Sequence, residues 1–402
     1  MSSSASGHRL ATPPAPPPPR TARERSDGQS VARNPPRVCF VGLENLPVLS
    51  RDFDQHLIGG EQVQHTLIAQ ALARRGIPVS MVVADLGQPD QALIGGIECF
   101  KAHGLREGLP VIRFLHPRLT KLWAALRRAD ADVYYVSCAG PQLGIVAWFA
   151  RLHGRRVVFR IAHDTDCQPD QLLIRFWRDK RLYEFGLRRA DQVLAQSDQQ
   201  SRALQSNYGV GSTVARMLVE PASQSLAFEQ RDIDVLWVNN LRPFKRPDLA
   251  LELARGLPQF RFHMVGGAMA GCEALFEQVQ AEARQIPNLV FHGAIPYQQV
   301  NAFYDRARVF VNTSDSEGFP NSYLQAWRSG VPTLVFFDPD RVVERNRLGV
   351  RANSIDGMAA DISALLSSEE RWQLDSGRCR AFMEDRYGED AVLAPYLAAL
   401  GA

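Results

Sequence analysis

The stretch RVFVNTSDSEGFPNSYLQAWRSGVPTLVFF at Arg308–Phe337 contains a strand, a loop, a helix and a second strand in close succession. The apolar runs at 308–313 and 333–337 are typical of strands that are buried on both faces. Pro320 suits the first turn of the helix between them. A strand, a helix and a strand in this order predict two parallel strands joined by a right-handed crossover.

The same alternation of strands and helices extends over most of the chain. It begins near Arg37 and restarts after residues 218–232. The strands are predicted at 37–42, 79–83, 133–137, 156–162 and 192–196, and again at 233–238, 261–267, 289–293, 308–313 and 333–337. We therefore predict two doubly wound, Rossmann-like α/β domains, at 37–225 and 226–402, that face a central cleft.

Composition excludes several classes of protein. The 46 basic and 43 acidic residues leave a net charge of +3, which argues against a general nucleic-acid binder. There is no apolar run long enough to span a membrane. The six cysteines have no metal-ligand spacing, which argues against structural zinc and suits a reducing cytoplasm. The segment 1–36, with its proline run at Pro13–Arg20, is predicted to be a disordered tail.

The loop after the strand at 308–313 has the composition of a phosphate site. Gly318 lets backbone approach a ligand closely, and the free amides of a helix that starts near Asn321 favour anions. Glu317 stands beside these amides, where its carboxylate could accept hydrogen bonds from sugar hydroxyls. The first strand is not followed by a GxGxxG turn and the chain has no Walker motif, so a dinucleotide site and a P-loop are poorly supported.

Glu317 and Gln325 are eight residues apart, and the segment at 314–332 resembles the Glu-x7-Glu signature of retaining glycosyltransferase family 4. The segments at 58–80, 235–254, 262–267 and 288–314 also resemble that family, so the similarity covers roughly residues 37–390. The resemblance implies the GT-B fold, in which the last helix often crosses back to the first domain. It also implies transfer of a sugar from a nucleotide-sugar donor.

The resemblance assigns roles to residues of the second half. Glu317 would hold the donor sugar's hydroxyls, and Lys245 would contact the donor diphosphate. Gln325 stands where a second glutamate usually holds the nucleotide ribose, and an amide brings no charge to that position. The family's usual arginine falls on Asn240, and nearby Arg242 is the candidate to replace it.

The chemistry explains these residue types. A departing nucleoside diphosphate carries negative charge, which fixed cations and amide dipoles stabilise. The resemblance implies that this happens without a bound metal and with no cofactor. Lys245, Arg242 and the segment Gly318, Phe319, Pro320 and Asn321 would then perform the task.

Two features of the first half point toward the cleft. Gly59 and Gly60 precede a helix whose free amides suit the donor phosphate or the acceptor. His163 follows a strand and matches a histidine that the family presents to the reacting sugar, where it could bond the sugar or help to move the acceptor proton. Asp164 and Asp166 imitate a metal-binding DxD motif that belongs to a different glycosyltransferase architecture, so we predict no metal there.

The segment 171–189 is basic and carries Phe176, Trp177, Tyr183 and Phe185. Such a helix can lie on anionic lipid, or it can pack on the sheet with a solvated basic side. We expect a cytoplasmic protein, and contact of this segment with the inner face of the membrane stays open beside packing on the sheet.

The sequence thus predicts a retaining glycosyltransferase that acts on a saccharide or lipid-linked acceptor, in the synthesis of a cell-surface polysaccharide or glycolipid. The departures at Gln325 and Asn240 keep open a catalytically weak GT-B subunit that binds a partner or a saccharide. A nucleotide-sugar epimerase or a phosphorylase of the same fold also stays open. The sequence does not indicate the base, the sugar or the acceptor.

Overall fold

The computed structural model describes residues 34–53, 59–105, 107–109, 114–220, 222, 224, 226–269 and 271–402. Residues 35–402 form one compact unit. The proline run at Pro13–Arg20, on which the predicted tail depends, lies outside the described residues.

The N-terminal half is built on an eight-stranded sheet. In spatial order its strands are β3 (Gln91–Ile94), β4 (Ile97–Lys101), β2 (Val79–Val83), β1 (Val38–Val41), β5 (Val133–Ser137), β6 (Arg156–Arg160), β7 (Gln192–Ala195) and β8 (Thr213–Val214). All neighbours run parallel except β3 and β4. Cys39 and Val41 face one core while Val38 and Phe40 face the other, as expected of a strand with period two that is covered on both sides.

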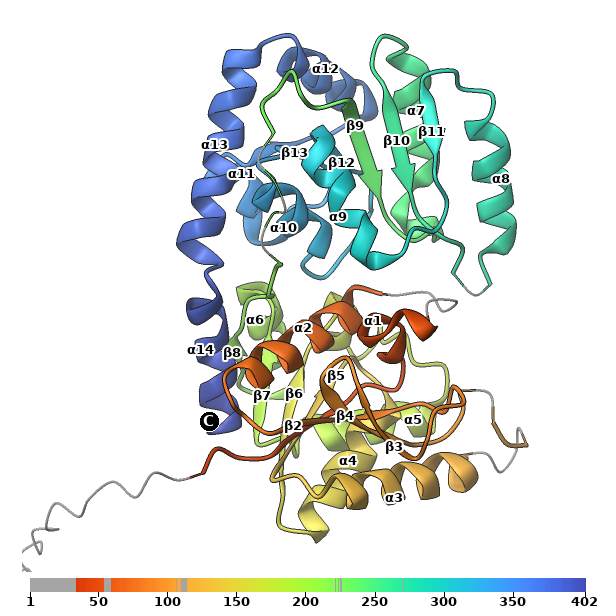
Figure 1. Cartoon of the computed structure of the whole chain (residues 1–402), viewed down its shortest axis with the longest axis vertical. Helices are drawn as coiled ribbons and strands as arrows, with labels where there is room; N and C mark the ends of the chain where they lie inside the picture. Colours follow the sequence, from red (N-terminus) through yellow and green to blue (C-terminus); the bar gives the residue numbers. More distant parts are fainter. Residues whose placement is uncertain are drawn as a thin grey trace, which may run out of the picture. The chain divides into compact units, whose positions relative to one another are not determined.

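Helices cover both faces of this sheet (Figure 1). One face carries α3 (Thr120–Ala129), α4 (Pro141–Leu152), α5 (Trp177–Leu187) and α6 (Asp198–Tyr208). The other carries α1 (Leu46–Leu49), α2 (Gly60–Arg74) and the C-terminal helix α14 (Glu389–Leu400). The Tyr396 hydroxyl of α14 accepts a hydrogen bond from Arg160 Nε (3.1 Å) and donates to the Arg216 carbonyl (2.9 Å), so the end of the chain packs on the first sheet.

The C-terminal half is built on a six-stranded parallel sheet. Its order is β11 (Leu289–Phe291), β10 (Phe262–Val265), β9 (Ile233–Val238), β12 (Ala307–Asn312), β13 (Thr333–Val335) and β14 (Gly349–Arg351). One face packs on α7 (Pro247–Gly256), α8 (Glu273–Ala283) and α12 (Ile355–Leu366). The other packs on α9 (Tyr297–Arg306), α10 (Asn321–Arg328), α11 (Val342–Asn346) and the later turns of α13 (Glu369–Arg386).

Each of the ten predicted strands is present, and the doubly wound α/β class is confirmed. The sequence reading missed β3, β4, β8 and β14. β3 and β4 form a hairpin around Gly95 (φ 56°) and Gly96 (φ 80°), where a tight turn requires positive φ at both positions. Among the described helices, none is long and apolar enough to cross a membrane.

Chain order reverses between β1 and β5 in the first sheet and between β9 and β12 in the second. In sheets of this kind, ligands bind beside such reversals, outside the carboxyl ends of the strands. The loops after these strands are therefore the places to look for a site.

Candidate active site

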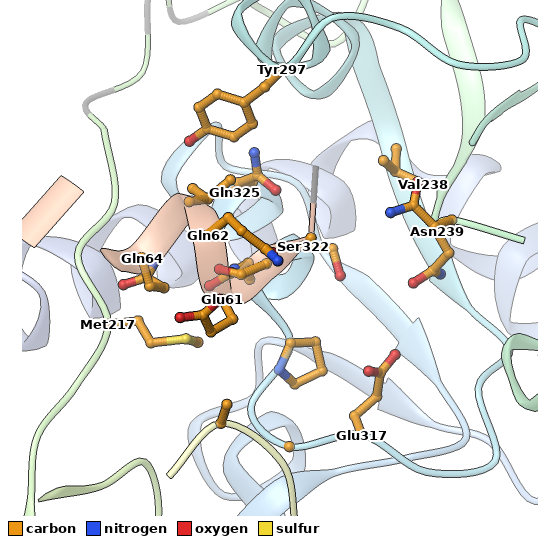
Figure 2. Close-up of a pocket in the computed structure, with 18 of the residues that line it drawn as sticks. Glu61, Gln62, Gln64, Met217, Val238, Asn239, Tyr297, Glu317, Ser322 and Gln325 are labelled. Carbon is orange, nitrogen blue, oxygen red and sulfur yellow. The ribbon is translucent and has the colours of Figure 1, made fainter. Parts of the chain in front are cut away.

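One cavity of about 690 Å³ lies at the carboxyl ends of strands from both sheets (Figure 2). Every residue that the sequence analysis assigned to the site lines it: Gly59, Gly60, His163, Arg242, Lys245, Glu317, Gly318, Phe319, Pro320, Asn321 and Gln325. Asn240, where the family's arginine was expected, lines it as well. Their chemical roles stay predictions.

Lys245 and Glu317 form an ion pair on the C-terminal side of the cavity. Lys245 ends a short 3-10 turn after β9, and Glu317 lies in the loop between β12 and α10. The two loops are tied together because Thr313 Oγ1 donates to the carbonyls of Lys245 (2.9 Å) and Arg246 (2.8 Å). Ser314 Oγ also donates to Glu317 Oε1 (2.8 Å).

This pair is largely removed from water, with side-chain exposures of 13% for Lys245 and 10% for Glu317. Burial lowers the pKa of the Lys245 ammonium, and the nearby Glu317 carboxylate opposes that shift. The lysine therefore keeps its charge at a cost that an adjacent anion reduces. A diphosphate in the cavity would be such an anion.

Gly318 lies in a close contact between the two halves of the molecule. A Cβ atom on Gly318 would stand 2.7 Å from the Ala162 carbonyl oxygen and 3.1 Å from Gln196 Oε1. Gln196 Oε1 also accepts a hydrogen bond from the Phe319 amide (2.9 Å). Sequence reasoning missed Gln196, although its place directly after β7 was the signal that could have found it.

The starts of α2 and α10 contact each other at the wall of the cavity. Asn321 Nδ2, at the start of α10, donates to the Gly60 carbonyl at the start of α2 (2.8 Å). Neither helix has a side-chain cap. Free amides at both starts make this part of the cavity favourable for an anion.

His163 follows β6 and faces the same cavity. Its Nδ1 atom lies 3.2 Å from the Thr165 backbone N–H, which can only donate, so the neutral ring carries its proton on Nε2. Burial lowers the pKa of His163; the Glu317 carboxylate opposes this shift and the Lys245 cation adds to it. A neutral ring with its proton on Nε2 is suited to donate a hydrogen bond, and this favours the first of the two roles that the sequence left open for it.

The carboxylates of the DxD-like turn are engaged with the protein. Asp166 Oδ2 accepts hydrogen bonds from the backbone amides of Ala162 (3.1 Å) and His163 (3.0 Å). Asp164 Oδ1 accepts one from Gln200 Nε2 (2.9 Å). These bonds give both aspartates a structural role at the end of β6. No cluster of three or more metal-ligating side chains occurs among the described residues.

Gln325, on α10, belongs to a chain of polar side chains along the cavity wall. Its Nε2 atom donates to Asn301 Oδ1 (2.9 Å), and Asn301 Nδ2 donates to Glu220 Oε2 (2.9 Å). The Tyr297 hydroxyl donates to the same Glu220 oxygen (3.3 Å). Sequence reasoning missed Asn301, Glu220 and Tyr297, because nothing in their local sequence marks them.

The basic segment 171–189 forms a helix only over α5, at Trp177–Leu187. Leu173 is 76% exposed and Trp177 is 78% exposed, whereas Tyr183 is fully buried. Tyr183 therefore belongs to the packed side of this segment, and its hydroxyl donates to the Asp166 carbonyl (2.7 Å). Leu173 also lines the cavity.

Comparison with known proteins gives matches to both halves. Residues 59–221 match the glycosyl transferase 4-like domain, and residues 219–374 match the glycosyl transferases group 1 family. The O-antigen biosynthesis glycosyltransferase WbnH of Escherichia coli is 34% identical over 109 residues, which are 27% of this chain and 29% of WbnH. The probable O-antigen biosynthesis glycosyltransferase WbiN of Escherichia coli gives the same values. The matched stretch thus spans less than a third of these curated relatives.

Solved structures extend the likeness over nearly the whole chain. Sucrose-phosphate synthase from Thermosynechococcus elongatus has a TM-score of 0.70 at 15% identity, over 89% of this chain and 96% of that one. Anabaena HepE, in complex with UDP and glucose, has a TM-score of 0.69 at 14% identity, over 91% and 99%. WaaG, a glycosyltransferase involved in lipopolysaccharide biosynthesis, has a TM-score of 0.63 at 15% identity, over 90% and 98%.

At these identities the likeness to solved structures establishes the fold, and that fold is GT-B. The two family matches together run from residue 59 to residue 374 and include the loops that carry Lys245 and Glu317. The chain therefore belongs to the glycosyl transferases, with a 4-like N-terminal half and a group 1 C-terminal half.

Proposed function

We propose that this protein transfers a sugar from a nucleotide-sugar donor to an acceptor hydroxyl, with retention of the anomeric configuration and without a metal ion. The observation that carries the proposal is the buried Lys245–Glu317 pair beside the free amides at the start of α10. The pair places a cation for a diphosphate next to an acceptor for sugar hydroxyls.

In the proposed reaction the bond between the anomeric carbon and the diphosphate oxygen breaks, and its electron pair stays on the diphosphate. The acceptor oxygen attacks the same face of the sugar, and its proton passes to the departing phosphate oxygen. Lys245, Arg242 and the backbone amides of Gly318 and Asn321 stabilise the charge that develops on that oxygen.

Glu317 and His163 orient the donor sugar in this account. The Glu317 carboxylate accepts hydrogen bonds from the sugar hydroxyls, while His163 donates one from Nε2. A fixed sugar holds its anomeric carbon in line with the acceptor and the leaving group, and such positioning contributes strongly to the rate.

We further propose that the acceptor is a saccharide or a lipid-linked saccharide of a cell-surface polysaccharide pathway. The similarity to O-antigen glycosyltransferases supports the pathway. The exposed Leu173, Phe176 and Trp177 support peripheral contact with anionic lipid, because arginines flank them and Leu173 reaches the cavity. A lipid-linked acceptor could then enter from the membrane side.

The test incubates the protein with sugar nucleotides of uridine, guanosine and adenosine, and with saccharide acceptors, in EDTA. We expect release of nucleoside diphosphate together with a glycosylated product, and loss of at least 100-fold in Glu317→Ala and Lys245→Ala. Glu277→Ala, at an exposed position of α8, is the control that keeps activity.

The products separate the other readings. Retention is measured as the anomeric configuration of the product by NMR. Binding of nucleotide with no turnover across the panel would favour the catalytically weak subunit. A changed sugar nucleotide, or turnover that requires free phosphate, would favour an epimerase or a phosphorylase. Full activity in both alanine variants would refute the roles given to Glu317 and Lys245.

A further inference from the structure

Gln325 stands at a position where the resemblance implies a carboxylate, yet the polar chain that begins at Gln325 ends on a carboxylate, that of Glu220. Glu220, Asn301, Tyr297 and Gln325 all line the cavity. Figure 2 shows the Gln325 amide and the Tyr297 ring on the same side of it. The inference drawn from these hydrogen-bonded side chains rests on the proposed function, because it concerns the nucleotide part of the donor.

The direction of every hydrogen bond in the chain follows from Glu220. A carboxylate only accepts, so Asn301 must turn its Nδ2 toward Glu220 (2.9 Å). Asn301 Oδ1 then faces Gln325 and can only accept, so Gln325 must donate from Nε2 (2.9 Å). The amide of Gln325 is thereby fixed in one orientation, and its Oε1 atom is left as the acceptor for a ligand.

We propose that Glu220 is a positioning residue for the donor nucleotide. Its charge replaces the one that residue 325 lacks, and through Asn301 it holds Gln325 Oε1 toward the cavity to accept a hydrogen bond from a ribose hydroxyl. Gln325 touches the ligand in this arrangement, and Glu220 acts through it.

Two further contacts hold Glu220 in place. Arg328 Nη1, on α10, donates to the Glu220 backbone carbonyl (2.6 Å) and fixes the segment that carries it. Burial raises the pKa of Tyr297, and the Glu220 carboxylate adds to the shift. The phenol therefore keeps its proton and remains a donor to Glu220 Oε2.

The chain of bonds predicts the outcome of moving the charge. In Gln325→Glu, Asn301 lies between two carboxylates, and one of its ends must face an oxygen that cannot donate to it. In the double variant Glu220→Gln/Gln325→Glu, residue 220 donates to Asn301 Oδ1 and Asn301 Nδ2 donates to residue 325. Both hydrogen bonds of Asn301 are then satisfied again, in the reverse direction, and the Tyr297 hydroxyl accepts from the amide of residue 220 where it donated before.

The experiment measures binding of UDP, GDP and ADP by calorimetry, and then of the 2′-deoxy and 3′-deoxy forms of the tightest binder. It uses the full chain, the two single variants, the double variant and Glu277→Gln, an exposed control on α8. Thermal unfolding of each variant without ligand separates loss of fold from loss of binding.

We expect Gln325→Glu to weaken binding about 10-fold, as for a lost hydrogen bond in a buried site. Glu220→Gln should weaken it less, because a glutamine at 220 can still accept from Asn301 in one of its two orientations. The double variant should return to within about 3-fold of the wild type and regain its preference for ribose over one of the deoxyriboses.

The inference is overturned if Gln325→Glu binds as tightly as the wild type, or if the double variant binds no better than Gln325→Glu while both fold normally. It is also overturned if the wild type does not distinguish ribose from either deoxyribose. Absence of binding of all three diphosphates to the wild type would be a different result, since it would refute the proposed function itself.

Discussion

Breaking the Lys245–Glu317 ion pair should lower the stability of the fold, by an amount that can be derived from the burial of the pair. Removing one partner of a buried ion pair leaves an uncompensated charge, which costs about 3–5 kcal/mol in folding stability. The side chains are 13% and 10% exposed, so solvent screens them little. Glu317→Gln should therefore destabilise the fold by about 3 kcal/mol at pH 7, since Lys245 loses its carboxylate.

Lys245→Met should cost less, about 1–2 kcal/mol, because Glu317 keeps two other donors. These are Ser314 Oγ (2.8 Å) and Asn312 Nδ2 (3.5 Å). The double variant Lys245→Met/Glu317→Gln leaves no buried charge at either position, so it should recover about 2 kcal/mol relative to the sum of the single losses. The assay is urea unfolding of all four proteins, followed by tryptophan fluorescence.

The loss of stability in Glu317→Gln should also depend on pH. Burial lowers the pKa of Lys245, and removal of Glu317 lowers it further. A lysine whose folded pKa lies below its unfolded value costs stability while it is charged, and the cost falls as pH rises through the folded pKa. The penalty of Glu317→Gln should therefore shrink between pH 7 and pH 10. Additive single losses, or a penalty that grows with pH, would refute the reasoning.

Three further predictions concern the contact between the halves, the end of β6 and the exposed apolar side chains of Leu173, Phe176 and Trp177. Gly318→Ala should reduce nucleoside diphosphate affinity at least 5-fold, measured by calorimetry, because its Cβ would lie 2.7 Å from a backbone oxygen. The control Gly377→Ala, in open space on α13, should instead stabilise the fold by about 0.5–1 kcal/mol, measured by urea unfolding. Burial raises the pKa of Asp166 to about 6 from 3.8, so its contribution to stability is lost as pH rises from about 4 through 6. The stability of Asp166→Asn relative to wild type should therefore rise by up to about 3 kcal/mol between pH 4 and pH 7; a pH series of urea curves would show no such trend if the carboxyl were already ionised at pH 4. Trp177→Ala should weaken sedimentation with anionic liposomes several-fold while Leu374→Ala, exposed on α13, should not, and equal binding of both would discard the membrane contact.

The sequence predicts the fold correctly where strands are buried on both faces. The stretch Arg308–Phe337 gave β12, α10 and β13 nearly at their observed bounds, since continuous apolar runs and a helix-starting proline agree there. β3 was missed because it is a four-residue edge strand with no fully buried residue, where Leu93 is 77% exposed. The Gly95–Gly96 turn is the local sequence signal of this hairpin.

The sequence predicts those residues of the candidate site whose position depends on local sequence. Glu317, Lys245 and His163 lie in the loops that follow β12, β9 and β6, so chain order alone places them at the carboxyl ends of strands. The polar side chains that lead from Gln325 to Glu220 could not be predicted, because Glu220 and Asn301 are 81 residues apart and meet only through tertiary packing. The tautomer of His163 likewise needed the position of a backbone amide.

A crystal structure of the protein with its preferred sugar nucleotide, grown in EDTA, tests the central claim most directly. We predict that the diphosphate lies within hydrogen-bond distance of Lys245 Nζ and of the amides at the start of α10, and that the sugar hydroxyls bond to Glu317. A nucleotide seated outside the cavity, or a ligand that binds only when a divalent ion joins its phosphates to the protein, would contradict it.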